Sequence, residues 1–97
     1  MAAYVINEIA VHDPERFQTY SQQVPAILAQ YGGAYVVRGG APEPVDGPSP
    51  PERLVVLRFA SREAARAWRS SPEYLAILPI REATSTSRVY LVDGYDG

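Results

Sequence analysis

The sequence has no cysteine and only one histidine, His12. Without cysteine the chain cannot form disulfides, thiolate metal sites or a cysteine nucleophile. A single histidine excludes a multi-histidine metal centre, and no spacing of acidic residues resembles a metal-binding motif. We therefore predict neither a bound metal nor another cofactor.

Lysine is absent as well, and the nine basic residues are all arginines scattered along the chain. The formal net charge is only −2. Nothing in this distribution indicates the clustered basic surface by which proteins bind nucleic acid or anionic membranes. No apolar run approaches the roughly 20 residues of a membrane span, and the first ten residues lack the basic and apolar regions of a signal peptide. We therefore expect a cytoplasmic protein with no nucleic-acid or membrane partner.

The composition that remains is typical of a globular protein. Hydrophobic residues make up 46% and charged residues 21% of the chain, and its 97 residues leave room for one domain spanning residues 1–97. Four segments rich in β-branched and apolar residues are typical of strands. They are residues 4–11, 34–38, 53–60 and 88–92.

The first helical pattern begins after Asp13 and runs to about Tyr31. Asp13 can accept a hydrogen bond from a free backbone N–H of the first turn, and Pro14 suits the first helical position. Apolar residues then recur at steps of three and four, which indicates one buried face. Pro25 lies inside this stretch, and we expect it to kink or break the helix there.

The second helical pattern consists of two short helices, predicted over residues 61–69 and 72–82. Ser61 begins the first of them, and Ser71 followed by Pro72 repeats the capping arrangement of Asp13 and Pro14. The polar residues 84–87 then connect to the last strand.

The predicted order is β-α-β-β-α-β, the ferredoxin-like arrangement. We therefore predict an α+β fold with a four-stranded antiparallel sheet and helices on one face. Residues 41–52 hold five of the nine prolines, and proline cannot donate to a sheet ladder. This segment is either a surface connector or a lid or dimer clasp, since long loops in compact domains are often functional.

Both faces of the predicted sheet are apolar. Val55, Leu57 and Phe59 alternate with Leu54 and Val56 in the third strand, whereas a half-exposed sheet alternates apolar with polar residues. The helices can cover only one face, so the other would expose an apolar patch of the size that marks an interface. We expect a homodimer, a dimeric α+β barrel whose two sheets enclose an apolar space. The alternative is that the proline-rich loop and the C-terminal tail cover this face.

Several strings also resemble a known family, the one catalogued as domain of unknown function 1330. They are GGAYVVRGG (residues 32–40), AARAWRSSPEYLAI (64–77), Ile80-Arg81, the opening YVINEIAVHDPERFQTY, the turn Asp46-Gly47 and the closing YLVDG. The resemblance implies a dimeric α+β barrel of ferredoxin-like subunits, in a superfamily shared with antibiotic-biosynthesis monooxygenases, and no assigned reaction. The chain departs from the family at Ala34, where Arg is common, and at Asp46, where Glu is frequent. If that arginine contacts a ligand in relatives, this chain binds another ligand or binds it less tightly.

Arg38 is the first candidate site residue. Its guanidinium lies in an apolar strand, where a charge must be paired or reach water. It either forms an ion pair with Glu8 or Asp46, or its planar fork grips an anionic group of a ligand.

The other candidates lie on the predicted helices. Tyr20, Trp68 and Tyr74 have the spacing of core residues, but their polar tips need partners when buried, so they can also edge a cavity. Arg81 either interacts with the negative end of its helix or contacts an anion in a pocket.

Three functions fit these residues. The first is a site for a small anionic or aromatic metabolite in a barrel pocket, including a cofactor-independent enzyme, with Arg38, Tyr20, Asn7 and His12 orienting the ligand or moving protons. His12 could also be a haem ligand, or simply an exposed loop residue before a helix. The second function is a non-catalytic binding or stress-related module, and the third is a structural dimer with a filled interior. An Arg38 side chain beside aromatics in an open cavity favours the first two, and an Arg38–Glu8 pair favours the third.

Overall fold

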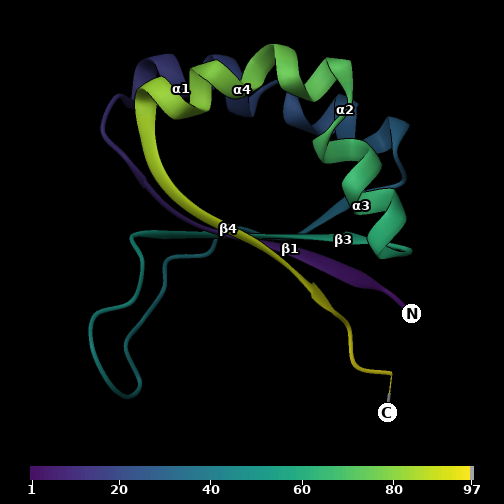
Figure 1. The fold of residues 1–97 in the computed structure, drawn as a ribbon. Helices are drawn as coiled ribbons and strands as arrows, with labels where there is room; N and C mark the ends of the chain where they lie inside the picture. Colours follow the sequence, from purple (N-terminus) through teal and green to yellow (C-terminus); the bar gives the residue numbers. More distant parts are fainter. Residues whose placement is uncertain (97) are drawn as a thin grey trace.

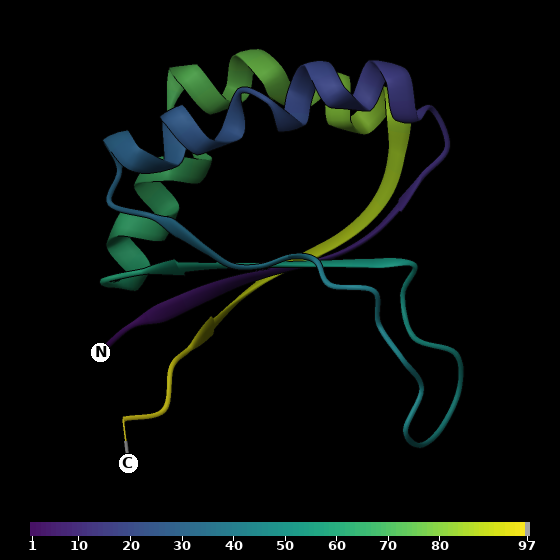
Figure 2. The ribbon, with the colours of Figure 1, turned by 180° about the vertical axis from the view of Figure 1, so that it is seen from behind.

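The computed structural model describes residues 1–96, which form a four-stranded antiparallel sheet with helices on one side of it (Figures 1 and 2). The sheet order is β2-β3-β1-β4. The elements in chain order are β1 (Ala3–Val11), α1 (Pro14–Ser21), α2 (Val24–Gln30), β2 (Ala34–Gly39), β3 (Arg53–Phe59), α3 (Arg62–Arg69), α4 (Pro72–Thr84) and β4 (Ser85–Asp93). The predicted ferredoxin-like α+β fold is confirmed.

Three helices begin where the capping residues predict. The Asp13 carboxylate accepts from the backbone N–H of Arg16 at 3.3 Å, and the Ser61 hydroxyl accepts from that of Ala64 at 3.1 Å. The Ser71 hydroxyl accepts from the N–H of Tyr74, also at 3.1 Å. Each bond satisfies a backbone donor that has no partner within its helix.

The predicted break at Pro25 is displaced by two residues. Gln22 and Gln23 form a turn between α1 and α2, and Pro25 lies in the first turn of α2. In a first turn the missing proline N–H has no intrahelical acceptor to lose, so proline is tolerated there. Proline therefore marks the start of the second segment and not the point at which the first one fails.

The prediction that residues 84–87 are a connector outside the sheet is wrong. Helix α4 continues to Thr84 and β4 begins at Ser85. Ser85, Thr86 and Ser87 pair with the last residues of β1. The Thr84 hydroxyl donates to the Ile80 carbonyl at 2.7 Å, so the helix end satisfies this polar side chain internally. The polar composition of residues 85–87 therefore did not indicate a strand, because their pairing is set by the neighbouring strand β1.

The hydrophobic core lies between the helices and the sheet. Val5 and Ile9 of β1 are buried on this side, whereas Tyr4 and Ile6 point to the outer face and stay half-buried. The proline-rich loop and the C-terminal segment project from the sheet on the side opposite the helices (Figures 1 and 2). They extend away from the outer face and do not lie across it. Among residues 1–96, no helix has the length and apolar character to cross a membrane.

Candidate functional site

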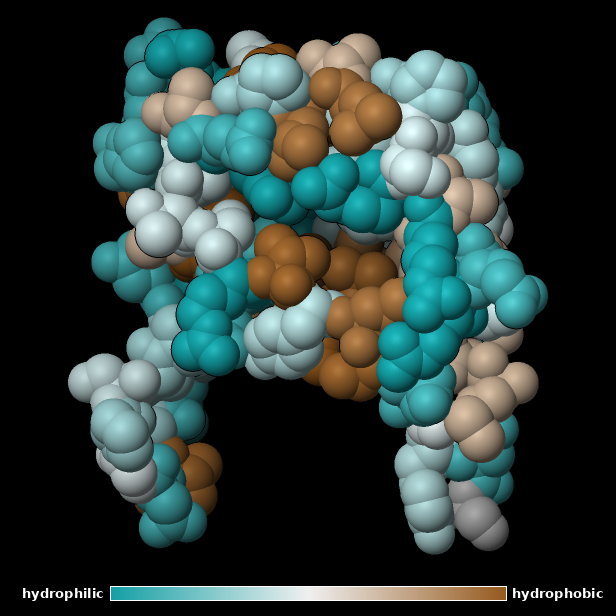
Figure 3. All heavy atoms as spheres, viewed as in Figure 1, coloured by the Kyte–Doolittle hydropathy of each residue, from teal (hydrophilic) through white to brown (hydrophobic). Residues whose placement is uncertain are grey.

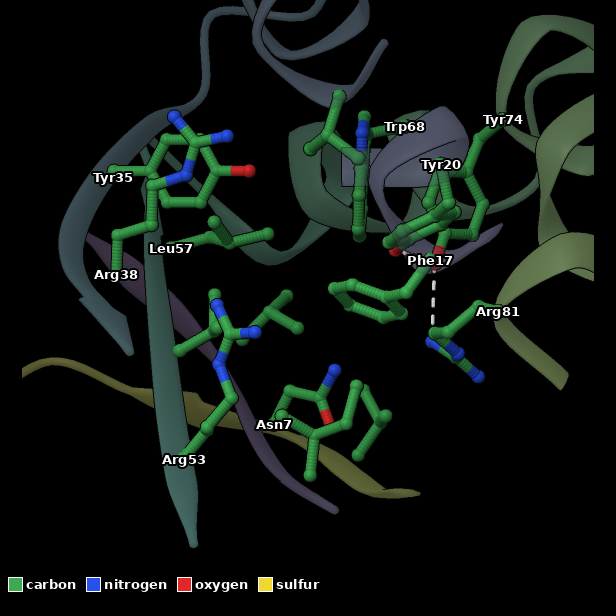
Figure 4. A pocket seen from close by; sticks show the side chains of 15 residues that line it. Asn7, Phe17, Tyr20, Tyr35, Arg38, Arg53, Leu57, Trp68, Tyr74 and Arg81 are labelled. Atoms are coloured by element: carbon green, nitrogen blue, oxygen red, sulfur yellow. Dashed lines mark hydrogen bonds between the residues drawn. The ribbon is translucent and has the colours of Figure 1, made fainter. Parts of the chain in front are cut away.

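A small, partly open cavity lies between the sheet and the four helices (Figure 4). Its volume is about 40 Å³, which is room for a few water molecules or one small chemical group. This cavity lies within a single chain, on the helix side of the sheet, and is separate from the apolar space that we expect between the two sheets of a dimer.

A β-bulge in β2 brings two residues to this cavity. Tyr35 lies opposite Leu57, but Val37 lies opposite Val56 and Arg38 opposite Val55, so one residue of β2 is extra. In a regular strand, residues three apart point to opposite faces. The bulge removes that alternation, so Tyr35 and Arg38 both line the cavity.

Three arginines line the cavity, and among residues 1–96 no carboxylate does. Arg38 donates to the Ser21 carbonyl at 3.1 Å, and its guanidinium carbon is 4.6 Å from the centre of the Tyr35 ring. The guanidinium of Arg53 lies 5.5 Å from the centre of the Phe17 ring. The cavity therefore holds positive charge against aromatic faces, without a fixed anion to balance it.

The predicted ion pair of Arg38 with Glu8 or Asp46 is not present within the described residues. The Glu8 carboxylate accepts from the Tyr90 hydroxyl at 2.7 Å, on the outer face of the sheet. Asp46 lies exposed in the proline-rich loop. Strand alternation separates Glu8 from the cavity, because Glu8 pairs across β1–β3 with Leu54 and not with the cavity-facing Val55.

Arg81 is buried and joins a chain of hydrogen bonds (Figure 4). Its Nη1 donates to the Tyr74 hydroxyl at 3.0 Å, and the Tyr20 and Tyr74 hydroxyls lie 2.7 Å apart. Burial raises the pKa of the Tyr20 phenol well above its ordinary value, and the nearby Tyr74 raises it further. Burial also raises the pKa of Tyr35, against the opposing effect of Arg38. Tyr20 and Tyr35 therefore keep their protons at neutral pH and can donate to a ligand.

Two buried polar atoms at the cavity have no hydrogen-bond partner in the described part of the chain, Asn7 Oδ1 and Trp68 Nε1. Asn7 interrupts an apolar strand between Val55 of β3 and Val89 of β4. An unsatisfied buried polar group costs about 1–3 kcal/mol. A ligand that pairs with Asn7 or Trp68 would recover that free energy.

The structure brings six of the seven predicted site residues together at the cavity: Asn7, Tyr20, Arg38, Trp68, Tyr74 and Arg81. Trp68 and Tyr74 also belong to the hydrophobic core, so each is both a core residue and a residue at the edge of the cavity. His12 is exposed at the end of β1, and its backbone N–H donates to the Thr84 carbonyl. It does not line the cavity. Residues 1–96 contain no cluster of acidic or histidine side chains able to hold a metal ion.

Among the aromatic and charged lining residues, sequence reasoning missed Phe17, Tyr35 and Arg53. The position of Arg53 could have been predicted, because period-two alternation places it on the same face of the strand as Val55 and Leu57. Tyr35 was not, because no residue of β2 signals the bulge that brings Tyr35 and Arg38 to one side.

Solved structures share this fold at low sequence identity. A protein of unknown function from Rhodopseudomonas palustris aligns with a TM-score of 0.82 and 16% identity, over 99% of this chain and 84% of that one. SnoaB, a cofactor-independent oxygenase from Streptomyces nogalater, aligns with a TM-score of 0.67 and 19% identity, over 99% and 95%. A NIPSNAP family protein from Agrobacterium tumefaciens aligns with a TM-score of 0.59 and 14% identity, over the same shares. At these identities the likeness shows the fold alone.

A search of curated proteins finds no match. A family model does match, that of the domain of unknown function DUF1330, and it covers residues 2–95. The match spans all four strands and all four helices of the described chain. The resemblance noted in the strings around Arg38 and Trp68 is thereby confirmed, and the chain belongs to the DUF1330 family.

Proposed function

We propose that this chain binds a small molecule with an anionic group, a carboxylate in the simplest case, in the arginine-lined cavity. The observation that carries the proposal is the placing of Arg38, Arg53 and Arg81 around one apolar cavity that no carboxylate of the described chain lines. A guanidinium matches a carboxylate in geometry as well as charge. Hydrogen bonds between charged groups are also stronger than neutral ones.

The remaining polar groups support an aromatic or otherwise unsaturated ligand. The rings of Phe17 and Tyr35 already face guanidinium groups. The protonated Tyr20 phenol and the unpaired Asn7 Oδ1 and Trp68 Nε1 offer donors and an acceptor at fixed positions. Small-molecule sites commonly combine apolar walls with a few such polar groups.

The test begins with mass spectrometry of the purified protein under native conditions, to detect a small acid that purifies with it. Calorimetry with butanoate then compares Arg53→Gln with Arg58→Gln, two changes on the same strand. Arg58 is exposed and faces away from the cavity. We expect Arg53→Gln to weaken binding about ten- to hundredfold, the equivalent of one charged hydrogen bond, and Arg58→Gln to leave it unchanged. Equal affinities in both variants would refute the proposal and favour a structural dimer with a filled interior.

A second candidate is a cofactor-independent enzyme that moves a proton on the bound ligand. The observation that favours it is the Arg81–Tyr74–Tyr20 hydrogen-bond chain, which ends at the cavity. Because the Tyr20 phenol keeps its proton at neutral pH, such a chain can deliver a proton to a carbon next to the anionic group. The fold likeness to SnoaB, a cofactor-independent oxygenase, is compatible with such chemistry.

This candidate predicts that the protein transfers a hydrogen from solvent to a ligand carbon. In D₂O, the identified ligand would gain deuterium in the presence of the protein, and Tyr20→Phe would slow this gain by a larger factor than it weakens calorimetric affinity. Absence of this transfer with a ligand that binds would leave the non-catalytic module as the function.

We also propose that the chain works as a homodimer joined through the outer face of the sheet. Ile6, Leu54 and Val56 point to that face and are only half-buried in a single chain. The proline-rich loop and the C-terminal segment project beside this face, with Val45 and Tyr95 almost fully exposed. Exposed apolar side chains on two projecting segments suit contacts around a second copy. A light-scattering mass equal to one chain at micromolar concentration would contradict this.

A further inference from the structure

A second hollow opens on the surface between α3 and β4. Ala65 and Leu91 belong to its apolar wall, Arg66 and Arg69 lie along it, and its volume is about 240 Å³. Figure 3 looks onto the β4 side of the molecule, where apolar side chains gather below the helices. We call this hollow the α3–β4 groove.

The groove adjoins the arginine-lined cavity. Val5, Trp68 and Val89 line both spaces. Trp68 is almost wholly buried and packs against Tyr74, with ring centres 4.4 Å apart, and against Phe59, at 5.5 Å. Its Nε1 has no hydrogen-bond partner in residues 1–96. The Trp68 indole therefore separates the cavity from the groove. Its Nε1 can donate a hydrogen bond to a ligand that lies beside it.

The two spaces differ in size and chemistry. Pockets for drug-sized ligands have volumes of about 300–1,000 Å³. The cavity, at about 40 Å³, holds charge but has room for only a small group. The groove, at about 240 Å³, has the room and an apolar wall but lies beyond the three cavity arginines. A ligand that uses both needs an anionic head and an extended apolar body.

We propose that the ligand of this chain is an elongated amphipathic anion, whose head lies among Arg38, Arg53 and Arg81 and whose apolar body passes Trp68 into the α3–β4 groove. This inference rests on the proposed function, since the cavity must first bind the head. In this proposal Trp68 determines how far a bound ligand extends from the cavity, and the α3–β4 groove is the subsite for the apolar body of the ligand.

The first test uses the unaltered protein and a series of straight-chain carboxylates, from butanoate through octanoate to dodecanoate, kept below their micelle concentrations. Trp68 is the only tryptophan, so its fluorescence reports binding beside the indole, and calorimetry gives the affinity. We expect affinity to rise about fourfold for each methylene buried, as the hydrophobic effect predicts, and to level off once the groove is full. Affinity independent of chain length would overturn the inference.

The second test fills the groove. Ala65 lies on its wall, whereas Ala67, two residues along α3, is exposed and does not line it. Ala65→Leu should reduce affinity for dodecanoate at least tenfold and leave that for butanoate within about twofold, and Ala67→Leu should change neither. Equal loss for both chain lengths in a folded Ala65→Leu variant would contradict the inference.

The two proposals fail in different ways. If carboxylates bind without any chain-length effect, and Arg53→Gln still weakens them, the proposed function stands and the groove subsite is wrong. If no carboxylate of any length binds, the proposed function and the inference are both wrong. If Ala65→Leu does not fold, the chain-length series in the unaltered protein decides alone.

Discussion

The two faces of the sheet use arginine differently. On the helix side, Arg53 faces the cavity and lies against the Phe17 ring. On the outer face, Arg58 of β3 and Arg88 of β4, the strands on either side of β1, are exposed. One residue type thus lines a cavity in the first setting and is a solvated charge in the second. The difference comes from strand alternation and from what covers each face, and not from the side chain itself.

Tyrosine repeats this contrast. Tyr74 is fully buried beneath the helices and accepts a hydrogen bond from Arg81. Tyr90 is 40% exposed on the outer side, where it donates to Glu8. On the helix side, therefore, one side chain both stabilises the core and lines the cavity, whereas the outer face has no such residue among those compared. Each prediction below tests this difference between the two sides of the sheet.

The largest expected effect is on core stability. Tyr74→Ala should lower the free energy of unfolding by about 3–5 kcal/mol, as for other large aromatic truncations in a core. Tyr90→Ala should cost less than about 1 kcal/mol in the isolated subunit, because its ring is already partly in water. Urea unfolding followed by circular dichroism compares the two. Similar losses would mean that the outer face is as closely packed as the inner one.

The next effect is on assembly. Ile6→Arg places a charge in the middle of the outer face, and burying an unpaired charge at an interface costs several kcal/mol. We expect the mass measured by sedimentation to fall from two chains to one. Ala76→Arg, on the exposed side of α4, is the control and should leave the mass unchanged. A dimer that survives Ile6→Arg would place the interface elsewhere.

A smaller effect concerns alkaline pH. The pKa of Tyr20 is raised in the folded chain by burial, so above about pH 10 the unfolded chain releases this proton while the folded one retains it. Stability from this group is complete below pH 10 and falls as the pH rises further. Tyr20→Phe should cost about 0.5–1.5 kcal/mol at pH 7 through the lost hydrogen bond. It should also flatten the decline of melting temperature between pH 9.5 and 11. A parallel decline in both proteins would show that Tyr20 does not contribute to it.

The smallest effect belongs to a surface ion pair. Arg62 Nε and the Asp93 carboxylate lie 2.6 Å apart at the end of β4, with side chains 39% and 56% exposed. Exposed pairs contribute about 0.2–1 kcal/mol and are screened by salt. Arg62→Gln should lower the melting temperature by no more than a few degrees, and 1 M NaCl should remove the difference. A loss that persists in salt would assign Arg62 a packing role.

Local signals predicted most of the fold. Asp13, Ser61 and Ser71 fixed three helix starts, because a capping hydrogen bond depends on a few neighbouring residues. The start of β4 at Ser85 was not predictable in this way. Its polar residues join the sheet because β1 continues alongside them, which is a long-range cause.

The candidate site divides along the same line. Side-chain chemistry identified Arg38, Tyr20 and Trp68 as candidates, because each has a charged or polar group at a position where a purely apolar residue would suffice for the core. Their neighbours Tyr35 and Arg53 reach the same cavity through strand geometry, and His12 fails to reach it because the chain turns at the end of β1. Composition and spacing identify reactive groups, but only the register of strands decides which of them meet.

Because β2 has one extra residue, the side of the sheet to which Arg38 points depends on the number of residues in this strand. Inserting one more residue between Tyr35 and Arg38, with the bulge retained, would turn the guanidinium toward the opposite side of the sheet, with every cavity side chain still in the sequence. Relatives that differ by one insertion or deletion in this strand could therefore select different ligands while keeping identical residues. Alignments that score substitutions alone would record such proteins as equivalent.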